Sequence, residues 1–446
     1  MEFQSKTFNI WIGLRSSDFQ IFDKLVDINQ IVSIDIDDTR NIPIISQELL
    51  TKKRMTWSNE ELLRVEKLES FKKLIRELET STKKVNIYCY HSLPVIERIA
   101  RKNKHIRIYA SPVNLKRKLD DKLTFLKFLK DLKLKSVYSL IFRINETNYH
   151  KLKRALGLPF VIKERIGASG GSTYFVRNEE DLMKLKKIIK TGVVLASKYI
   201  RGPSFNINAF IDKKIQLSPP SIQITGIPEC SCEKFTYCGN DFSSFNTIDS
   251  SIKDAFFDTT KKIGVKMQKM GYYGLFGIDF VYDPKNKILY PLEINPRFQG
   301  STPLLMRYQT FKELDRLIEL YENPNKIISY NYPVDVSFFL LHNINGKRMK
   351  VKRHFNSGIY KLYFRNREIN LKYLGNQYSF PRNKRELLIL GCPKVGTTVE
   401  PGAGILRIEF REDILNYTNM YLRKRYSELA RVIYKSLWGD YQLCVG

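Results

Sequence analysis

Two runs of residues, Gly277-Ile278-Asp279-Phe280-Val281 and Leu292-Glu293-Ile294-Asn295-Pro296-Arg297, lie on either side of Asp283-Pro284-Lys285-Asn286-Lys287. The outer runs are rich in strand-forming residues, and the segment between them holds the Asp, Pro and Asn residues that favour a turn. The sequence therefore predicts a β-hairpin with strands over residues 275–282 and 288–295.

The second strand of this hairpin alternates polar and apolar side chains. Successive side chains of a regular strand point to opposite faces, so Glu293, Asn295 and Arg297 project together, whereas Leu292 and Ile294 face the core. One face of the strand thus presents a carboxylate, an amide and a guanidinium.

The length of the turn decides which residue of the first strand joins this face. With a turn over residues 283–287, Tyr282 lies opposite Ile288 and Asp279 lies opposite Pro291. Asp279 then shares a face with Glu293, one diagonal step away.

Two carboxylates, one amide and one guanidinium on a single patch suit a magnesium–nucleotide site. Mg²⁺ takes oxygen ligands from one or two carboxylates, completed by substrate phosphates and water. An adjacent Arg can bind the charge that develops during phosphoryl transfer. The alternative interpretation of the pattern is a surface hairpin with a solvated Arg–Glu pair.

A glycine-rich loop supplies a second signal. Lys163 ends a predicted strand over residues 158–163 and precedes Gly167-Ala168-Ser169-Gly170-Gly171-Ser172. Glycines let backbone N–H groups close on phosphate oxygens, and the lysine adds a point charge. The loop is no Walker A motif, because no Gly-Lys-Ser/Thr ends it. The alternative interpretation is an ordinary glycine-rich hairpin turn.

Taken together and in this order, these residues resemble the ATP-grasp superfamily, and the chain resembles its biotin carboxylase-like branch over nearly the whole length. The residues that carry the resemblance are Lys122, Lys163, the glycine loop, Lys198-Tyr199-Ile200, Asp279, Glu293, Asn295 and Arg297. The resemblance implies an α/β (α+β) fold: an ATP-grasp core, an N-terminal α/β domain and a strand-rich C-terminal domain.

The pattern along the chain agrees with three domains. Before residue 113, short buried strands alternate with helices, one of which opens at the capping box Ser58-Asn59-Glu60-Glu61 and runs to about residue 79. We expect an N-terminal α/β domain over 1–112, an ATP-grasp core over 113–328 with a lid over about 150–200, and a strand-rich C-terminal domain over 329–446 that closes with a helix over 414–437.

The resemblance assigns roles at the nucleotide end of the site. Lys122 and Lys163 would bind the phosphates of ATP. The loop over 167–172 would close over them, through Gly167, Ser169, Gly170, Gly171 and Ser172. The backbone of Lys198, Tyr199 and Ile200 would meet the adenine.

The resemblance also assigns roles at the reacting end. Asp279 and Glu293 would hold Mg²⁺, with Mn²⁺ as the alternative ion, and Asn295 would assist them. Arg297 would steady an acyl phosphate and its oxyanion. Asn295 and Arg297 are thus the candidate catalytic residues, and ATP and Mg²⁺ the implied cofactors.

Departures from the family pattern narrow the reaction. Arg297 is followed by Phe298-Gln299-Gly300-Ser301-Thr302, without the Glu-His pair of biotin carboxylases, which disfavours bicarbonate chemistry on biotin. The segments 219–223 and 237–242 resemble ATP-grasp ligases that make amide or peptide bonds. We expect a carboxylate–amine ligase that works through an acyl phosphate and releases ADP and phosphate. The alternatives are a phosphotransferase and a basic binding protein with a vestigial ATP site.

The composition of the chain limits the kinds of binding partner that we expect. The chain has 446 residues, a formal charge of +29 and six cysteines. The charge favours an acidic peptide or carrier protein as a partner beside small-molecule or peptide substrates, while the intact site set argues against a nucleic-acid protein. The chain has no membrane span or signal peptide, so we expect a cytoplasmic protein with free thiols. A zinc site at Cys230, Cys232 and Cys238 is the less favoured alternative, and a homodimer, common among relatives, stays open.

Overall fold

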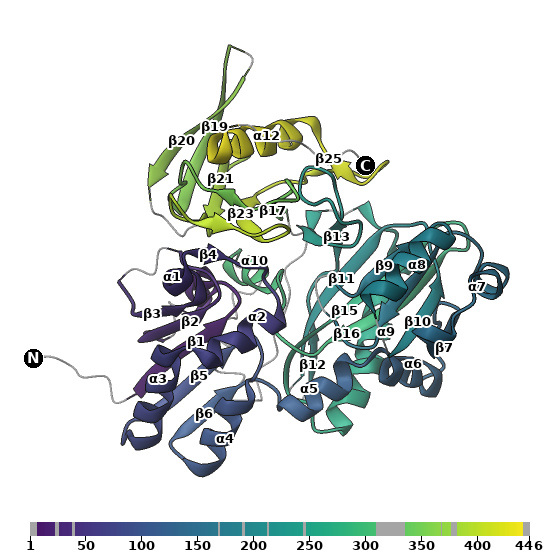
Figure 1. The fold of residues 1–446 in the computed structure, drawn as a ribbon, viewed down its shortest axis with the longest axis horizontal. Coiled ribbons are helices and arrows are strands. Elements are labelled where there is room, and N and C mark those ends of the chain that lie inside the picture. The colour runs from purple at the N-terminus through teal and green to yellow at the C-terminus, as the bar shows by residue number, and fades with distance from the viewer. Residues whose placement is uncertain are drawn as a thin grey trace, which may run out of the picture.

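The structure is a computed structural model that describes residues 7–22, 26–37, 41–167, 170–189, 192–211, 214–243, 247–308, 335–366, 368–375 and 381–439. Three regions can be followed in Figure 1: an N-terminal α/β region (purple to blue), a central region (teal) and a C-terminal region (green to yellow). Among the described residues, no helix combines the length and the apolar character needed to cross a bilayer.

The N-terminal region is built on a parallel sheet with the order β3-β2-β1-β5-β6. Its strands are β1 (Thr7–Gly13), β2 (Gln30–Ser33), β3 (Ile44–Ser46), β5 (Lys84–Cys89) and β6 (Ile106–Tyr109). Its helices are η1 (Ser16–Ile21), α1 (Gln47–Thr51), α2 (Asn59–Arg64), η2 (Val65–Lys67), α3 (Glu69–Thr80) and α4 (Pro94–Lys102). The predicted small α/β unit with a parallel sheet is therefore confirmed.

The helix predicted from residue 58 starts correctly but is not continuous. The Ser58 hydroxyl accepts a hydrogen bond from the Glu61 N–H at 3.2 Å and caps α2. Leu68 then adopts extended backbone, with φ −71° and ψ 133°, and this interrupts the run before α3.

A small antiparallel sheet with the order β7-β10-β8-β9 includes the segment expected to act as a lid, and its region is called the lid below. Its elements are β7 (Ser139–Arg143), η3 (Ile144–Glu146), α7 (Tyr149–Leu156), β8 (Phe160–Glu164), β9 (Thr173–Val176), α8 (Glu179–Ile188) and β10 (Val193–Lys198). The lid has its own apolar core, in which Leu152 and Leu182 from the helices pack on Phe160 and Val194 from the sheet. Two helices, α5 (Val113–Asp120) and α6 (Lys122–Asp131), lead into it.

One large sheet of 11 strands joins the central and C-terminal regions, in the order β16-β15-β11-β13-β14-β17-β23-β21-β19-β20, with β12 paired to β11. Its central strands are β11 (Ser204–Ile211), β12 (Ile215–Leu217), β13 (Ser221–Thr225), β14 (Tyr237–Asp241), β15 (Gly274–Asp283) and β16 (Ile288–Asn295). Its C-terminal strands are β17 (Ser337–His342), β19 (Gly358–Arg365), β20 (Glu368–Gly375), β21 (Glu386–Leu390) and β23 (Gly404–Phe410). The pairing of β14 with β17 makes the sheet continuous.

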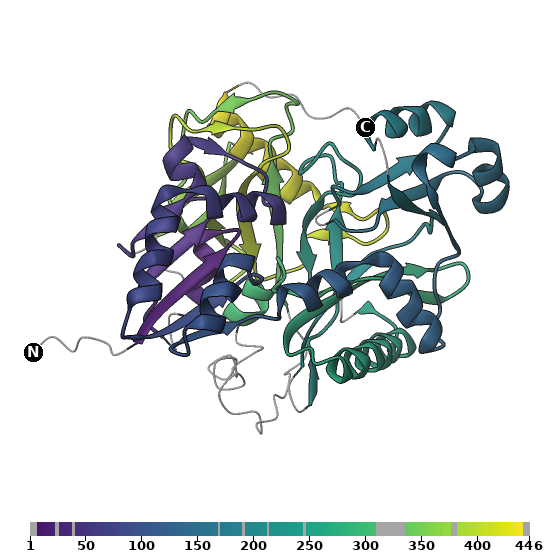
Figure 2. The ribbon, with the colours of Figure 1, turned by 60° about the horizontal axis from the view of Figure 1, so that its bottom comes forward.

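Both faces of the large sheet are covered at β17, near its centre. On β17, Phe339 and Leu341 belong to the core that includes α9 (Ser250–Lys269) and α12 (Lys424–Trp438). Phe338 and Leu340, which alternate with them, pack in the cluster of the N-terminal region. Figure 2 shows that region lying beside the sheet. The remaining short elements are β4 (Lys53–Arg54), α10 (Thr302–Arg307), β18 (Met349–Lys350), β22 (Thr398–Val399), β24 (Leu415–Asn416) and β25 (Tyr421–Leu422).

The closing helix predicted over 414–437 is correct only in its second part, because residues 415–422 form the β24–β25 hairpin. Asn416 accepts a hydrogen bond from the Thr418 N–H, and Asn419 accepts one from the Tyr421 N–H, each at 3.0 Å. Short polar side chains of this kind favour turns over helix by bonding nearby backbone.

The cysteines also differ in part from the expectation. Cys89, Cys230, Cys238 and Cys392 are buried free thiols, whereas Cys232 is disulfide-bonded. The prediction of free thiols is therefore wrong for Cys232. The predicted domain limit at residue 328 lies outside the described residues.

Candidate active site

The hairpin of β15 and β16 carries the two candidate metal ligands. Asp279 pairs directly with Glu293, and Phe280 pairs with Pro291, so Leu292 is an extra residue in β16. The diagonal register predicted from the turn is thus wrong: Asp283 lies opposite Ile288, and a bulge restores the shared face. The bulge also turns Leu292 to the cavity described below, rather than to the core as predicted.

Asp279 is held by two amides. Asn206 on β11 donates a hydrogen bond to Oδ1 at 2.6 Å, and Asn295 donates one to Oδ2 at 3.0 Å. Burial and the neighbouring carboxylate of Glu293 raise the pKa of Asp279 to about 6. A cation bound between Asp279 and Glu293 would offset the repulsion between their two carboxylates.

Glu293 faces two lysines from different elements. The Lys122 ammonium, in the first turn of α6, lies 3.3 Å from its Oε2. Burial favours the neutral acid, but Lys122 and Lys163 outweigh it and lower the pKa of Glu293. Burial lowers the pKa of Lys163 on β8, and Glu293 acts in the opposite direction. The lysines and the carboxylate pair therefore form one electrostatic unit.

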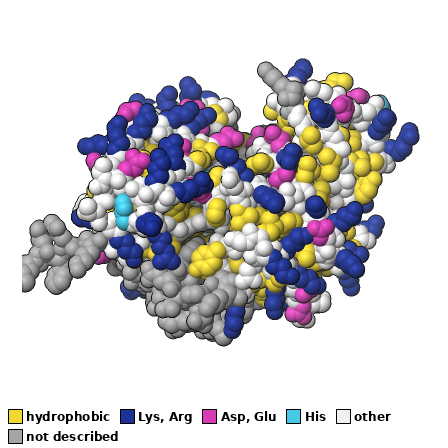
Figure 3. Space-filling view, turned by 90° about the horizontal axis from the view of Figure 1, so that it is seen from below, with side chains coloured by type: hydrophobic (Ala, Val, Ile, Leu, Met, Phe, Trp, Pro, Cys, Tyr) yellow, Lys and Arg dark blue, Asp and Glu magenta, His cyan; other side chains and the backbone are white. Residues whose placement is uncertain are grey.

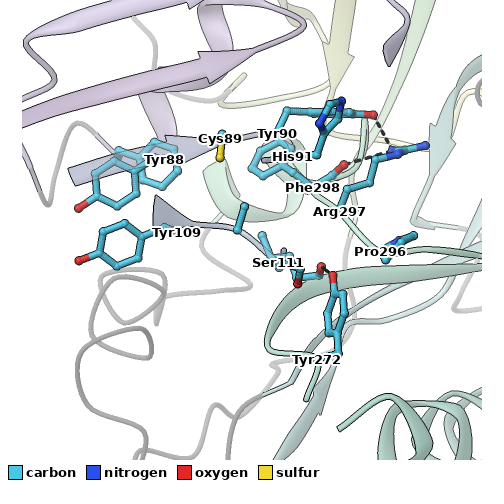
Figure 4. Close-up of a pocket in the computed structure, with 13 residues that line it drawn as sticks. Tyr88, Cys89, Tyr90, His91, Tyr109, Ser111, Tyr272, Pro296, Arg297 and Phe298 are labelled. Carbon is cyan, nitrogen blue, oxygen red and sulfur yellow. Dashed lines mark hydrogen bonds between the residues drawn. The ribbon is translucent and has the colours of Figure 1, made fainter. Parts of the chain in front are cut away.

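Arg297 continues this unit towards the N-terminal region. Its Nη2 donates to Asn295 Oδ1 at 2.8 Å, and its Nη1 donates to the Tyr90 hydroxyl at 2.5 Å and to the Phe298 carbonyl at 3.2 Å. Figure 4 shows Arg297 directed at Tyr90, which follows β5. Among the described carboxylates none lies within 4.0 Å of Arg297 as an ion-pair partner. The guanidinium is thus oriented by neutral groups and can bind an anionic ligand.

The glycine loop folds back on itself and meets the central region. Gly170 has φ +82°, and a Cβ there would lie 1.8 Å from the Phe235 carbonyl oxygen. A Cβ on Gly167 would lie 1.6 Å from Ser172 Oγ, and the Ser172 carbonyl accepts a hydrogen bond from the Glu164 N–H. Gly170 in particular has no room for a side chain, because it meets backbone atoms and has a positive φ. Ser169 lies outside the described residues.

An aromatic cluster with one lysine closes the nucleotide end. Phe175 of the lid and Tyr199 after β10 form an edge-to-face pair at 4.9 Å. The Lys234 ammonium lies 4.5 Å from the Phe175 ring centroid and 5.5 Å from that of Tyr199. This Phe175–Tyr199–Lys234 cluster joins the lid to the segment that meets Gly170.

A single cavity of about 1410 Å³ brings together most of the predicted residues: Lys163, Gly170, Gly171, Lys198, Tyr199, Ile200, Asp279, Glu293, Asn295 and Arg297. Lys122 does not line the cavity itself but contacts Glu293, which does. Gly167 and Ser172 shape the loop but do not line this cavity. A cavity of about 20 Å³ behind Arg297, drawn in Figure 4, has room for about one water molecule.

The residues fit a magnesium–nucleotide ligand by the chemistry of their donors. Among the described residues, no group of three or more His, Cys, Asp or Glu side chains is placed to hold a metal ion. The Asp279–Glu293 pair, with the Asn295 amide beside it, instead matches a Mg²⁺ site in which phosphates and water supply the remaining ligands.

Sequence reasoning missed Tyr90, Asn206 and Gln299. Asn206 bonds both Asp279 and, at 2.7 Å, the Gln299 amide oxygen. An alternating strand pattern could have drawn attention to Asn206 and Asn208 on β11, since both are polar and buried between apolar neighbours. Tyr90 carries no such signal.

Comparison with known proteins identifies the central region. Residues 119–301 match the sequence model of a family described as an ATP-grasp domain. The fold is similar to that of N5-carboxyaminoimidazole synthetase from Staphylococcus aureus complexed with ADP, with 15% identity, 98% of each chain covered and a TM-score of 0.54.

Two further structures have a similar fold. Biotin carboxylase from Campylobacter jejuni shares 14% identity over 92% of this chain and 87% of its own, with a TM-score of 0.60. The biotin carboxylase domain of 2-oxoglutarate carboxylase from Hydrogenobacter thermophilus shares 14% identity over 92% and 86%, with a TM-score of 0.58. The predicted resemblance is confirmed: residues 119–301 match the ATP-grasp domain model, and the chain as a whole has a fold similar to that of the biotin carboxylase-like ATP-grasp enzymes.

Proposed function

We propose that this protein is an ADP-forming carboxylate–amine ligase that joins a substrate carboxylate to an amine in an amide or peptide bond. The observation that carries the proposal is the unit of Asp279, Glu293, Lys122, Lys163 and Arg297 around one cavity. The ATP-grasp match and the ATP-grasp enzymes with a similar fold support the ligase class.

Mg-ATP, when bound, supplies the phosphoryl group that activates the carboxylate. Asp279 and Glu293 would hold the ion, with Asn295 beside them. Lys122 and Lys163 would compensate phosphate charge, and Gly170 and Gly171 line the same cavity. The backbone of residues 198–200, which line the cavity, would hold the base.

Arg297 acts on the reacting carboxylate. It lies next to Asn295, and its guanidinium lacks a carboxylate partner among the described residues. It therefore offsets negative charge as the carboxylate oxygen attacks phosphorus and again when the amine attacks the acyl phosphate. The lid and the Phe175–Tyr199–Lys234 cluster exclude water, which would otherwise hydrolyse the intermediate.

The segment after Arg297 supports an amine acceptor rather than biotin. Phe298 packs against Trp11 and Tyr90, with ring centroids at 5.4 and 6.0 Å, and Gln299 bonds Asn206. Neither side chain offers an acid or a base at the position of the Glu-His pair of biotin carboxylases. Proton transfer from the amine would then involve substrate, water or phosphate.

The basic surface enters the proposal as a way to attract acidic substrates. Lys and Arg side chains are scattered over the face drawn in Figure 3 and do not single out one docking patch. We therefore propose that the basic surface as a whole attracts an acidic peptide or carrier protein over a long range. We also propose a homodimer, by analogy with the domain dimer of one similar structure.

The test is ATP turnover with Mg²⁺ against a library of amino acids and short peptides, followed by mass spectrometry. ADP release that needs both a carboxylate and an amine, with a joined product, is the expected result. A phosphorylated product without a new amide would identify a phosphotransferase instead. Mg-ATP turnover that Glu293→Gln leaves unchanged would contradict the site itself.

A further inference from the structure

The cavity is larger than one nucleotide needs. Typical pockets for a single small ligand measure about 300–1,000 Å³, whereas this one measures about 1410 Å³. Side-chain contacts show which residues are neighbours along the cavity. Lys122 contacts Glu293 at one end. Asn295 then links Asp279 to Arg297, and Arg297 contacts Tyr90. The cavity then continues beyond Tyr90 to residues of the N-terminal region.

Arg15 lines this far end of the cavity. It follows β1, at the carboxyl edge of the parallel sheet, and is 6% exposed. Its Nε donates to Asp18 Oδ2 at 3.1 Å, and its Nη2 lies 3.1 Å from the same oxygen and 3.4 Å from the Gly300 carbonyl. Among the described residues, its Nη1 donates no hydrogen bond. A buried guanidinium with a free donor that faces a cavity calls for an acceptor there.

The surroundings of Arg15 form a built site rather than a solvated surface. Trp57 lies under the guanidinium, with the Arg15 Cζ 5.6 Å from its ring centroid, and Asp35 fixes the indole N–H at 3.1 Å. The Tyr237 phenol is close enough to interact electrostatically with Arg15. Trp57 and Tyr237 both line the cavity, so they flank whatever Arg15 binds.

Tyr90 connects this end to the reacting centre. It accepts a hydrogen bond from Arg297 at 2.5 Å and interacts electrostatically with Arg15. Arg297, Tyr90 and Arg15 therefore line one continuous stretch of the cavity.

We propose that the substrate between Arg297 and Arg15 is an amino acid or short peptide, and that Arg15 binds its non-reacting carboxylate. The inference rests on the proposed ligase function and adds the substrate class and the residue that selects it. Asp18 already occupies one edge of the guanidinium, which leaves one donor edge for a singly charged carboxylate. A doubly charged phosphate would crowd Asp18 with like charge.

The experiment compares free acids with their amides. L-amino acids and dipeptides, each as the free acid and as the C-terminal amide, are tested with Mg-ATP for ADP release and joined product. Their binding is also measured by calorimetry with a non-hydrolysable ATP analogue. We expect free acids to be used and bound, and their amides to be at least about 100-fold weaker, because a buried charged partner is lost.

Substitutions at Arg15 test the same contact. We expect Arg15→Leu to raise KM for the free acid roughly 100-fold, with little change in KM for ATP, and to abolish the preference over the amide. Arg15→Lys keeps the charge beside Asp18 and should raise KM for the free acid about 10-fold. This variant tests the contact even if Arg15→Leu fails to fold. Arg407→Lys is the matched control, because Arg407 bonds the same Gly300 carbonyl at 2.8 Å but does not line the cavity.

The outcomes separate the two proposals. Equal use of acids and amides, or an unchanged KM for the free acid in Arg15→Lys, would overturn the role of Arg15 while leaving a ligase that forms joined products intact. Failure of every free acid to bind would overturn it as well. A carboxylate preference that depends on Arg15, with only phosphorylated product, would support the role of Arg15 and contradict the ligase reaction.

Discussion

Asp279 and Glu293 stand directly opposite each other on β15 and β16 because Leu292 adds one residue to the second strand. Without that bulge, Asp279 would pair with Leu292, and the carboxylates would point to opposite faces of the sheet. The bulge therefore creates the pair, and the amides of Asn206 and Asn295 fix the Asp279 carboxylate within it.

Removal of one charge from this pair should stop turnover without unfolding the protein. We expect Glu293→Gln to lower kcat for ADP release on the order of 10²–10³-fold, because the ion and the two lysines lose their shared carboxylate. Glu368→Gln, at an exposed residue of β20, is the control. ADP release and thermal melting are measured for both variants. Full turnover in Glu293→Gln would show that the pair holds no essential ion.

Gly170 should tolerate no side chain. Gly170→Ala forces a Cβ against the Phe235 carbonyl, whereas Gly271→Ala has a matching φ of +83° but meets nothing within 4 Å. Both variants carry a backbone strain of about 1–2 kcal/mol, so their difference isolates the contact between the loop and Phe235. We expect KM for ATP to rise only in Gly170→Ala. Equal KM values would mean that the loop does not act in nucleotide binding.

Lys234 should slow the release of nucleotide. Its ammonium lies over Phe175 of the lid and near Tyr199. Because exposed cation–π contacts contribute about 0.5–1 kcal/mol each, we expect Lys234→Met to weaken ATP-analogue binding by about 2- to 20-fold, mainly through faster dissociation. Stopped-flow displacement measures the rate. Lys102→Met, on an exposed face of α4, supplies the comparison, and equal off-rates would contradict the closing role of the cluster.

His91 should make the fold sensitive to acid. Burial and the nearby Lys116 lower its pKa to about 3, while a hydrogen bond to the Ser92 carbonyl opposes the shift. The unfolded chain binds this proton near pH 6.5, so the neutral imidazole stabilises the folded state above that pH. The stabilisation is lost as pH falls from about 6.5 towards 3, at about 1.4 kcal/mol per pH unit.

Denaturant titrations at pH 7.5 and pH 5 test this. We expect His91→Gln to reduce the loss of unfolding free energy between the two pH values by about 2 kcal/mol relative to the unsubstituted protein. His150→Gln, at an exposed residue of α7, is the matched substitution. The same loss in His91→Gln and in the unsubstituted protein would show that His91 does not carry the effect.

The hairpin of β15 and β16 could be predicted because its signals are local. A run of a few residues is enough to indicate the Asp-Pro-Lys-Asn-Lys turn and the glycine loop. The bulge at Leu292 could not be predicted, because one extra residue in a strand leaves no mark on its composition. The error in register nevertheless left Asp279 and Glu293 on the same face.

The far end of the site could not be predicted for a different reason. Arg15 acquires its burial and its contacts from Gly300, which is 285 residues away in the sequence, and from Trp57. Nothing near Arg15 in the sequence distinguishes it from the many exposed basic residues of a chain with charge +29. Only the packing of the N-terminal region on the large sheet selects it.

The continuity of the large sheet limits how the chain can be shortened. β17 pairs with β14, and β23, β21, β19 and β20 follow outward from it. A truncation that removed these strands would expose β14 as a bare edge, with unpaired N–H and C=O groups ready to add strands from other molecules. The C-terminal region therefore cannot be removed as an independent domain, and its loss should turn the folded protein into a chain prone to aggregation.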